Sequence, residues 1–410
     1  MTHDPEESEP QDDVWGAFVR RFEQPRAATA PGALNGWTVA VKDCFQIAGV
    51  PLTAGSADFA EWYGVPQQDA WAVSALSAAG AQVVGTTAMH ELAYGITGIN
   101  RGQGTPRNPA VDGAIPGGSS SGSAVAVAAG LARFALGTDT GGSIRAPAAL
   151  CGIWGYRPTH GVLPLTGCVP LAPSFDTVGV MAGTGADLEA VLELLWASEA
   201  AGGLVDGPPM ERVWVVLDAV ERAGDAMQRA IDEAASRLSA AGVRVRELRL
   251  HVLDEIREAQ APIQGAEAWA THERWIDEMS PKIGDDVARL LRIGSERTPV
   301  ELKAAQAERS RLIALLHDRI GLDHGLLLPA ALGTAPALTE FDDPERSLAN
   351  RIGMLTLHNV ATIGGFPAVA VPAQRDDDPP LGVQLVGPRG RDRELLRVSR
   401  LMAAGARPSF

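Results

Sequence analysis

Residues 116–161 read PGGSSSGSAVAVAAGLARFALGTDTGGSIRAPAALCGIWGYRPTHG, with two clusters of small residues around an alanine-rich stretch. The first cluster, PGGSSSGS (116–123), has the composition of a flexible linker. A buried helix is predicted directly after it, over 123–133, and a second cluster follows at 137–145. Because glycine allows unusual backbone angles and close approach, the alternative is a loop that brings its backbone against a ligand.

Predicted strands and helices alternate on both sides of this segment. The run WTVAVKDCF (37–45) predicts a buried strand, and residues 69–87 predict a helix and then a strand. Residues 213–248 predict strand, helix and strand, and residues 251–293 predict a helical region. Further strands are predicted at 325–329, 367–373 and 382–387. This alternation is typical of an α/β layered fold.

Composition narrows the class of protein. The chain has 410 residues, 46% of them hydrophobic, and a formal net charge of −15, which disfavours nucleic acid as a partner. Residues 1–12 predict a disordered acidic tail, with neither a signal peptide nor a membrane span. Three cysteines, none in a CxxC spacing, favour a reduced compartment, so we expect a cytoplasmic protein.

Several familiar sites are disfavoured. Residues 118–122, GSSSG, match the G-x-S-x-G nucleophile elbow, but that motif needs a strand before it. The preceding residues 107–117 contain two prolines and two glycines instead. No P-loop, no H-E-x-x-H and no zinc-ligand spacing of histidines is present, so we predict no metal site.

Lysine is rare in this chain, which draws attention to Lys42. Of 35 basic residues only Lys42, Lys282 and Lys303 are lysines. A desolvated lysine can lose its proton and act as a base, whereas arginine cannot. The structural alternative is a lysine that extends from a strand end to solvent or pairs with Asp43.

The second cluster suits acyl transfer. Such chemistry needs backbone N–H groups aimed at a developing oxyanion, and Thr140, Gly141, Gly142 and Ser143 offer them with little side-chain bulk. The alternative is a tight turn in which Asp139 pairs with Arg145, and both interpretations can hold together.

Taken together, residues 116–161 resemble the amidase signature family. The segments 36–56, 85–109 and 365–396 are similar to its other motif blocks, so the resemblance spans nearly the whole chain after the tail. It implies a Ser–cis-Ser–Lys triad, with Ser143 as nucleophile, Ser119 as bridging serine after a cis peptide bond, and Lys42 as base. Ser121, Arg157 and His90 depart from the common motif, but no triad residue is lost.

The resemblance also implies a pocket and an oxyanion hole. The oxyanion hole falls on the backbone of Thr140, Gly141, Gly142 and Ser143. By position, the substrate-binding residues are Met89, Ala93, Tyr94, Gly118 and Phe175. Trp269 is a further candidate, with ordinary core as its alternative.

The fold that the resemblance implies is a single α/β/α sandwich around a large, mixed, mostly parallel twisted sheet. One domain would cover 13–410, with a catalytic core at about 36–184 and 350–400 and a variable pocket and lid region at about 185–350. The expected activity is hydrolysis of a small amide to a carboxylate and ammonia, without metal or organic cofactor, in a homodimer.

Features at 104–109 and 174–179 are similar to the indole-3-acetamide hydrolase branch, and the short length also suits malonamidase-like members. The alternatives are an amidotransferase subunit that supplies ammonia to a partner, and a hydrolase of esters, carbamates or urea derivatives. Relatives that serve only as docking domains have lost triad residues, whereas Lys42, Ser119 and Ser143 are all present here.

Overall fold

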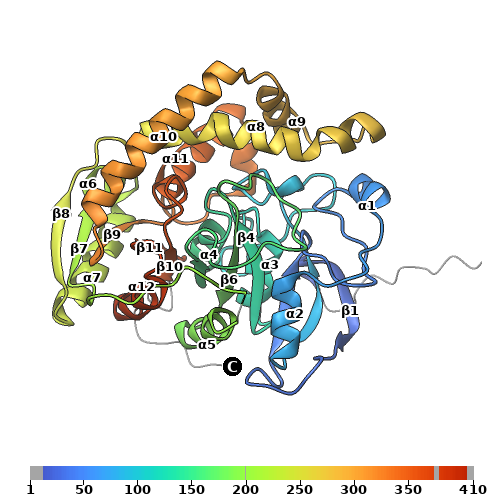
Figure 1. Ribbon diagram of the computed structural model, residues 1–410, viewed down its shortest axis with the longest axis horizontal. Coiled ribbons are helices and arrows are strands. Elements are labelled where there is room, and N and C mark those ends of the chain that lie inside the picture. The colour runs from blue at the N-terminus through green and yellow to red at the C-terminus, as the bar shows by residue number, and fades with distance from the viewer. Residues whose placement is uncertain (1–12, 199, 374–377, 404–410) are drawn as a thin grey trace, which may run out of the picture.

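A computed structural model describes residues 13–198, 200–373 and 378–403, and the predicted acidic tail lies outside them. Within these residues eleven strands form one sheet, in the order β1-β3-β2-β4-β6-β5-β10-β11-β9-β7-β8 (Figure 1). The strands are β1 (Phe18–Arg26), β2 (Thr38–Lys42), β3 (Gln82–Thr87), β4 (Phe134–Asp139), β5 (Trp154–Arg157), β6 (Thr177–Ala182), β7 (Arg212–Val216), β8 (Arg244–Leu248), β9 (His324–Pro329), β10 (Ala368–Pro372) and β11 (Gly382–Val386).

The sheet is mixed, as predicted, but it is not mostly parallel. Among the described strands, β2 pairs in parallel with β3 and β4, and β7 with β8 and β9, whereas the other six pairs are antiparallel. The prediction of a mostly parallel sheet was therefore wrong. The antiparallel pairs include β5 with β6 and β10 with β11, which follow one another in the chain and need no crossover connection.

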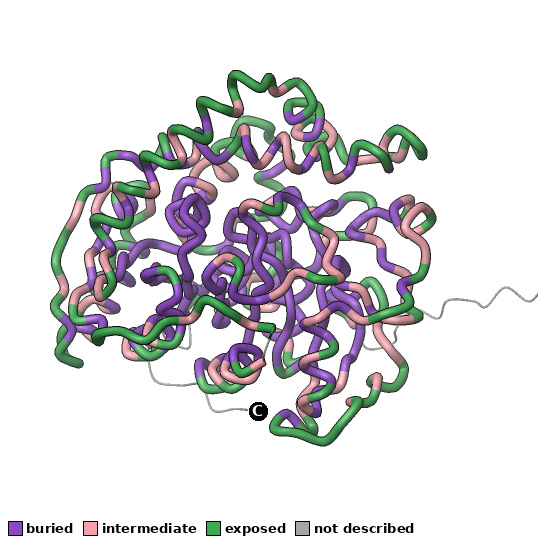
Figure 2. Tube along the Cα trace, in the orientation of Figure 1, coloured by how far each residue is buried: buried purple, intermediate pink, exposed green. Residues whose placement is uncertain are grey.

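Helices cover the sheet in two groups. One group comprises α2 (Trp71–Ala78), α5 (Gly185–Trp196), α7 (Asp225–Ala240) and α12 (Asp392–Ser399). The other comprises α3 (Ser121–Ala128), α4 (Arg145–Cys151), α8 (Leu253–Met279), α9 (Asp285–Ser295), α10 (Pro299–Ile320) and α11 (Pro344–Thr362). In Figure 1 helices α8, α9 and α10 run across the top, opposite α5, and Figure 2 shows the buried interior between them. A short helix, α6 (Leu217–Val220), follows β7, and α1 (Ala57–Tyr63) packs on α8.

Several elements end where the sequence indicates. The small-residue cluster leads straight into α3, so it is part of the folded interior and not a linker. The predicted helical region 251–293 is two helices, because α8 ends at Met279, before Ser280, whose φ is +46°, and Pro281. Helix α11 was not predicted from the sequence, and it completes the group over the turn at 139–145.

The parallel pairing of β2 and β4 positions the site. In the register of these two strands Val41 lies opposite Leu136, so the chain leaves both strands at the same edge. Lys42 is the last residue of β2 and Asp139 the last of β4. The loop before α3 reaches the same edge, because Ser120 bonds to the backbone of Thr138.

Candidate active site

Lys42 lies in the interior, with its amine between two hydroxyl groups. Its Nζ is 2.8 Å from Ser119 Oγ and 2.8 Å from Thr138 Oγ1, and the side chain is 0% exposed. Burial lowers the pKa of Lys42 from its ordinary value, although Cys44 and other acidic groups nearby oppose the shift. A lysine in this setting can hold its amine neutral and accept a proton. The alternative of an extended, solvent-reaching lysine is wrong.

The loop that carries Ser119 is fixed by its backbone. The peptide bond between Gly118 and Ser119 is cis, as the resemblance implies. The carbonyl of Ser119 accepts a hydrogen bond from the N–H of His90 at 3.0 Å, and the N–H of Ser120 donates to the carbonyl of Ser143 at 3.3 Å. This last bond joins the bridging-serine loop directly to the turn that holds the candidate nucleophile.

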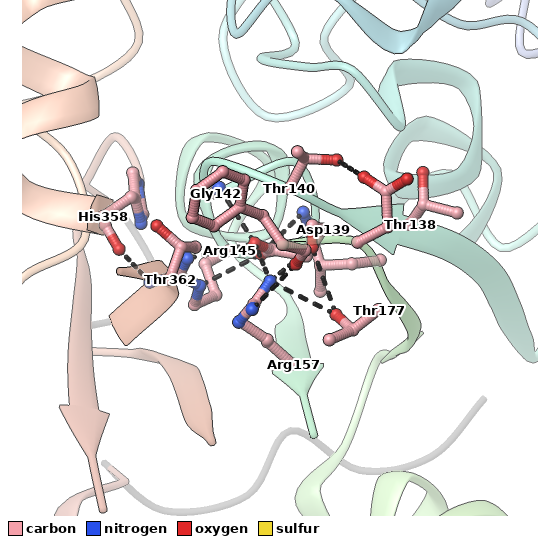
Figure 3. Close-up of polar contacts among 12 residues, drawn as sticks. Thr138, Asp139, Thr140, Gly142, Arg145, Arg157, Thr177, His358 and Thr362 are labelled. Carbon is pink, nitrogen blue, oxygen red and sulfur yellow. Dashed lines mark hydrogen bonds and ion pairs between the residues drawn. The ribbon is translucent and has the colours of Figure 1, made fainter. Parts of the chain in front are cut away.

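Asp139 organises the turn at 139–145 (Figure 3). Its carboxylate accepts from the N–H of Gly142 at 2.9 Å and of Ile144 at 3.2 Å, and from two guanidinium nitrogens of Arg145, each at 3.0 Å. Arg157 adds a second cation, whose Nη1 donates to Asp139 Oδ1 at 3.2 Å. Burial alone would raise the pKa of Asp139, but the two arginines hold it well below its usual range. The predicted pair of Asp139 and Arg145 is confirmed.

We expect Asp139→Asn to lower the free energy of unfolding by about 3–5 kcal/mol, because two buried guanidinium groups lose their counter-charge. Urea denaturation measures this, with Asp254→Asn as control, since Asp254 pairs with Arg222 at the surface and is expected to cost under about 1 kcal/mol. A depressed carboxyl pKa stabilises the fold above the ordinary value near 3.9, so the wild type loses this contribution as pH falls below about 4. Equal, small losses in both variants would contradict the role given to Asp139.

A second carboxylate holds the other side of the turn. Asp176 accepts from Thr140 Oγ1 at 2.5 Å and from the N–H groups of Leu171 and Ala172 at 2.9 and 3.0 Å. The carbonyl of Thr140 accepts from Gln260 Nε2, on α8, at 3.2 Å. The turn is thus braced by segments far apart in the chain.

Gly142 has a structural reason to be glycine. Its φ is +111°, and a Cβ there would lie 2.5 Å from Cγ of His358 on α11. Burial, together with the charge of Arg145, lowers the pKa of His358 to about 3, so a neutral ring packs against the turn. Because the N–H of Gly142 donates to Asp139, it is already engaged within the protein.

Ser143 opens onto a small cavity, here called the catalytic cavity. The side chain is 5% exposed, and the cavity has a volume of about 20 Å³. Its lining is Ala93, Tyr94, Gly95, Ile96, Thr140, Gly141, Ser143, Leu171, Gln264, Arg351 and Leu355. A buried lysine–serine pair beside a serine that faces a cavity and a turn of backbone N–H groups can perform acyl transfer.

The comparisons with known proteins show the family of the chain. The family model described as Amidase matches residues 19–396. The chain belongs to the amidase family. The chain is a hydrolase of this family that acts on amide C–N bonds. The chain is 33% identical to Amidase 1 of Oryza sativa subsp. japonica over 94% of both chains.

Two further relatives bear on substrate and fold. Over 44% of this chain and 40% of the relative, the sequence is 45% identical to the Indoleacetamide hydrolase of Pseudomonas syringae pv. syringae. A solved structure described as that of an amidase superposes with a TM-score of 0.80 at 32% identity, covering 91% of this chain and 85% of the other. The predicted α/β fold is therefore confirmed.

Of the predicted pocket residues in this amidase, Ala93 and Tyr94 line the catalytic cavity and three others do not. Met89 is buried, with its carbonyl bonded to Asn100, and Gly118 packs tightly on Gly98. Phe175 is buried beneath the guanidinium of Arg309. Met89, Gly118 and Phe175 do not line this cavity, and their role in substrate binding stays a prediction.

Trp269 also lies outside the cavity and packs against the main hydrophobic core, which supports its structural alternative. Sequence reasoning missed Gln264, Arg351 and Leu355, which reach the cavity from α8 and α11. A spacing of four residues puts Arg351 and Leu355 on one face of a helix. This spacing is the sequence feature that could have indicated that the two side chains line the same cavity.

A larger cavity of about 850 Å³, here called the outer cavity, shares Ile96 and Arg351 with the catalytic cavity. It lies between the loop at 96–102, α9 and the start of α11.

Among the described residues no group of three or more His, Cys, Asp or Glu could hold a metal ion. Within the same ranges no helix has the length and hydropathy needed to cross a membrane.

The nucleophile-elbow alternative would make Ser120 the reactive residue, but Ser120 is buried and engaged. Its Oγ donates to the carbonyl of Thr138 at 3.2 Å and accepts from the N–H of Thr138 at 3.4 Å. We expect Ser120→Ala to cost about 1–3 kcal/mol of stability and to change kcat/KM by less than about 10-fold. Ammonia release and urea denaturation measure the two effects. Complete loss of activity in a folded variant would restore the elbow alternative.

Proposed function

We propose that this chain hydrolyses a small primary amide, R–CO–NH2, to a carboxylate and ammonia through an acyl-enzyme on Ser143. The observation that carries the proposal is the contact of 2.8 Å between the buried Lys42 amine and Ser119 Oγ. A second contact supports the proposal. The hydrogen bond from the Ser120 N–H to the Ser143 carbonyl joins the two loops that carry the serines.

In the first half-reaction Ser143 Oγ attacks the carbonyl carbon. Its proton passes to Ser119 Oγ as the Ser119 proton passes to the neutral amine of Lys42. The charge on the carbonyl oxygen is met by backbone N–H groups of the turn. Because the N–H of Gly142 is donated to Asp139, we assign this task to Thr140, Gly141 and Ser143.

When the C–N bond breaks, the proton on Lys42 returns through Ser119 to the leaving –NH2 group, and ammonia departs. Water then attacks the ester on Ser143 and gives its proton to the same relay. Collapse of the second tetrahedral intermediate releases the carboxylic acid and restores Ser143. The balance is one amide and one water consumed for one carboxylic acid and one ammonia.

The size of the catalytic cavity favours a small reacting group. A volume of about 20 Å³ holds only one or two water molecules, which suits a carboxamide and not a bulky leaving group. The acyl part would then extend past Ile96 and Arg351 toward the outer cavity. The partial match to an indoleacetamide hydrolase supports arylacetamides as the first acyl class to test. A cytoplasmic location and a homodimer remain predictions.

The proposal is tested by ammonia release from arylacetamides, short aliphatic amides, ureas and glutamine, together with release of p-nitrophenol from matched esters. We expect ammonia and carboxylate in equal amounts from at least one primary amide, and an acyl adduct on the peptide that contains Ser143 when the reaction is quenched early. Turnover of esters or ureas without any amide would replace the proposed reaction. Glutamine turnover only with a second protein would indicate an amidotransferase subunit.

A further inference from the structure

Arg351 is the one charged side chain in the lining of the catalytic cavity. It belongs to α11, one helical turn before Leu355, and α11 rises about 1.5 Å per residue, so the two Cα atoms are about 6 Å apart along the axis. Leu355 covers the turn at 139–145, since its Cδ2 lies 3.2 Å from the position that a Cβ on Gly141 would take. Arg351 and Ser143 therefore lie in the wall of the same small cavity.

The protein gives this guanidinium little to bind. Among the described residues, no carboxylate lies within 4.0 Å of Arg351, although Asp286 is near enough to interact electrostatically. One nitrogen donates to the carbonyl of Tyr94 at 3.5 Å, which is a long bond, and the group lies 5.8 Å from the centre of the Tyr94 ring. A guanidinium carries five N–H donors, so most of its capacity for a bidentate partner is unused.

Arg351 also stands where the two cavities meet, since both include it in their lining. Burial lowers the pKa of Arg351 from its ordinary value, because desolvation disfavours the charged form. The rest of the catalytic cavity is apolar or neutral, including Ala93, Ile96, Leu171 and Leu355. Gln264 adds an amide whose oxygen accepts from Gln260 at 3.2 Å.

We propose that Arg351 binds a carboxylate on the acyl part of the substrate, so that the preferred substrates are monoamides of dicarboxylic acids. The proposal rests on the proposed function, because it assumes that the carboxamide sits at Ser143. An Arg–carboxylate pair in a partly buried site is strong and directional, and the substrate would supply the counter-charge that the protein does not.

The first test compares matched pairs of amides in the wild-type enzyme. Malonamate, succinamate and glutaramate are each paired with the amide in which an isopropyl group replaces the carboxylate, namely 3-methylbutanamide, 4-methylpentanamide and 5-methylhexanamide. An aryl pair, 4-carboxyphenylacetamide and 4-isopropylphenylacetamide, covers the arylacetamide class. We expect kcat/KM to favour the carboxylate member of at least one pair by about 10-fold or more. Preference for the isopropyl member in every pair would overturn the proposal.

The second test uses Arg351→Gln and Arg351→Lys, with Arg292→Gln as matched control. Arg292, on α9, is exposed and lines neither cavity. For the preferred carboxylate substrate we expect Arg351→Gln to lose about 100-fold in kcat/KM, mainly through KM, and Arg351→Lys to lose less. The isopropyl partner should lose under about 3-fold, and Arg292→Gln should keep the wild-type preference. Equal losses on both members of a pair would assign Arg351 a structural role and overturn the proposal.

A binding measurement separates this proposal from the proposed function. Ser143→Ala can bind the carboxylate substrate without turnover, and calorimetry should find that adding Arg351→Gln weakens its affinity by about 100-fold. If no amide releases ammonia but this binding and its loss are observed, the proposed reaction fails and the anion site stands. If neutral amides are hydrolysed and carboxylate binding does not depend on Arg351, the anion site fails alone.

Discussion

Lys42→Met is expected to lower kcat/KM for the best amide by about 10³- to 10⁴-fold without unfolding the chain. The lysine amine is buried and its pKa is lowered from the ordinary value, so an unbranched apolar side chain of similar length suits the same space. What methionine cannot do is take the proton that Ser119 passes on. Ammonia release measures the loss, and urea denaturation checks the fold.

The pH profile gives Lys42→Met a second, independent reading. A general base works only when deprotonated, so wild-type kcat/KM should rise with pH through the pKa of Lys42, below the ordinary lysine value near 10.4. This rise should be absent from the residual activity of Lys42→Met. Lys303→Met is the control, because Lys303 is exposed on α10 and lines neither cavity. A variant that keeps wild-type activity would remove lysine from the mechanism.

The chemical centre of this fold could be predicted because its residues lie in short, ordered motifs. Lys42 ends a strand, and Ser119 and Ser143 lie in two small-residue clusters that leave little freedom to the backbone. Even the partner of Asp139 could be named, since Arg145 is only six residues away and β4 leads directly into the turn. In such motifs the residues that determine the local backbone are the same residues that form the site.

The parts of the cavity wall that come from α8 and α11 could not be predicted in the same way. Gln264 and Arg351 reach the catalytic cavity only because α8 and α11 pack together over the turn, at more than a hundred residues' separation from Ser143. Arg157 stood out only as a departure from a family motif, yet it supplies the second cation on Asp139. Strand direction was misjudged for a related reason, because antiparallel pairs such as β4 with β6 are set by packing order and not by any single segment.

Ser143→Ala is expected to reduce ammonia release by at least about 10⁴-fold, close to the uncatalysed rate, since no acyl-enzyme can form. The change removes one oxygen from a side chain that is 5% exposed, so stability should stay within about 1 kcal/mol of wild type. Early-quench mass spectrometry should show the acyl group on the wild-type peptide that contains Ser143 and on none in the variant. An adduct that persists on the peptide with Ser119 or Ser120 would assign the nucleophile to the other loop.

The double variant Lys42→Met with Ser143→Ala tests whether the two residues act as one unit. If Lys42 serves only to activate Ser143 through Ser119, removing it from an enzyme without the nucleophile has nothing left to remove. The double variant should therefore be no slower than Ser143→Ala alone, within about 3-fold. A further loss of about 10³-fold in the double variant would mean that Lys42 activates something else, such as water, and that the relay from Lys42 through Ser119 to Ser143 is not the path of the proton.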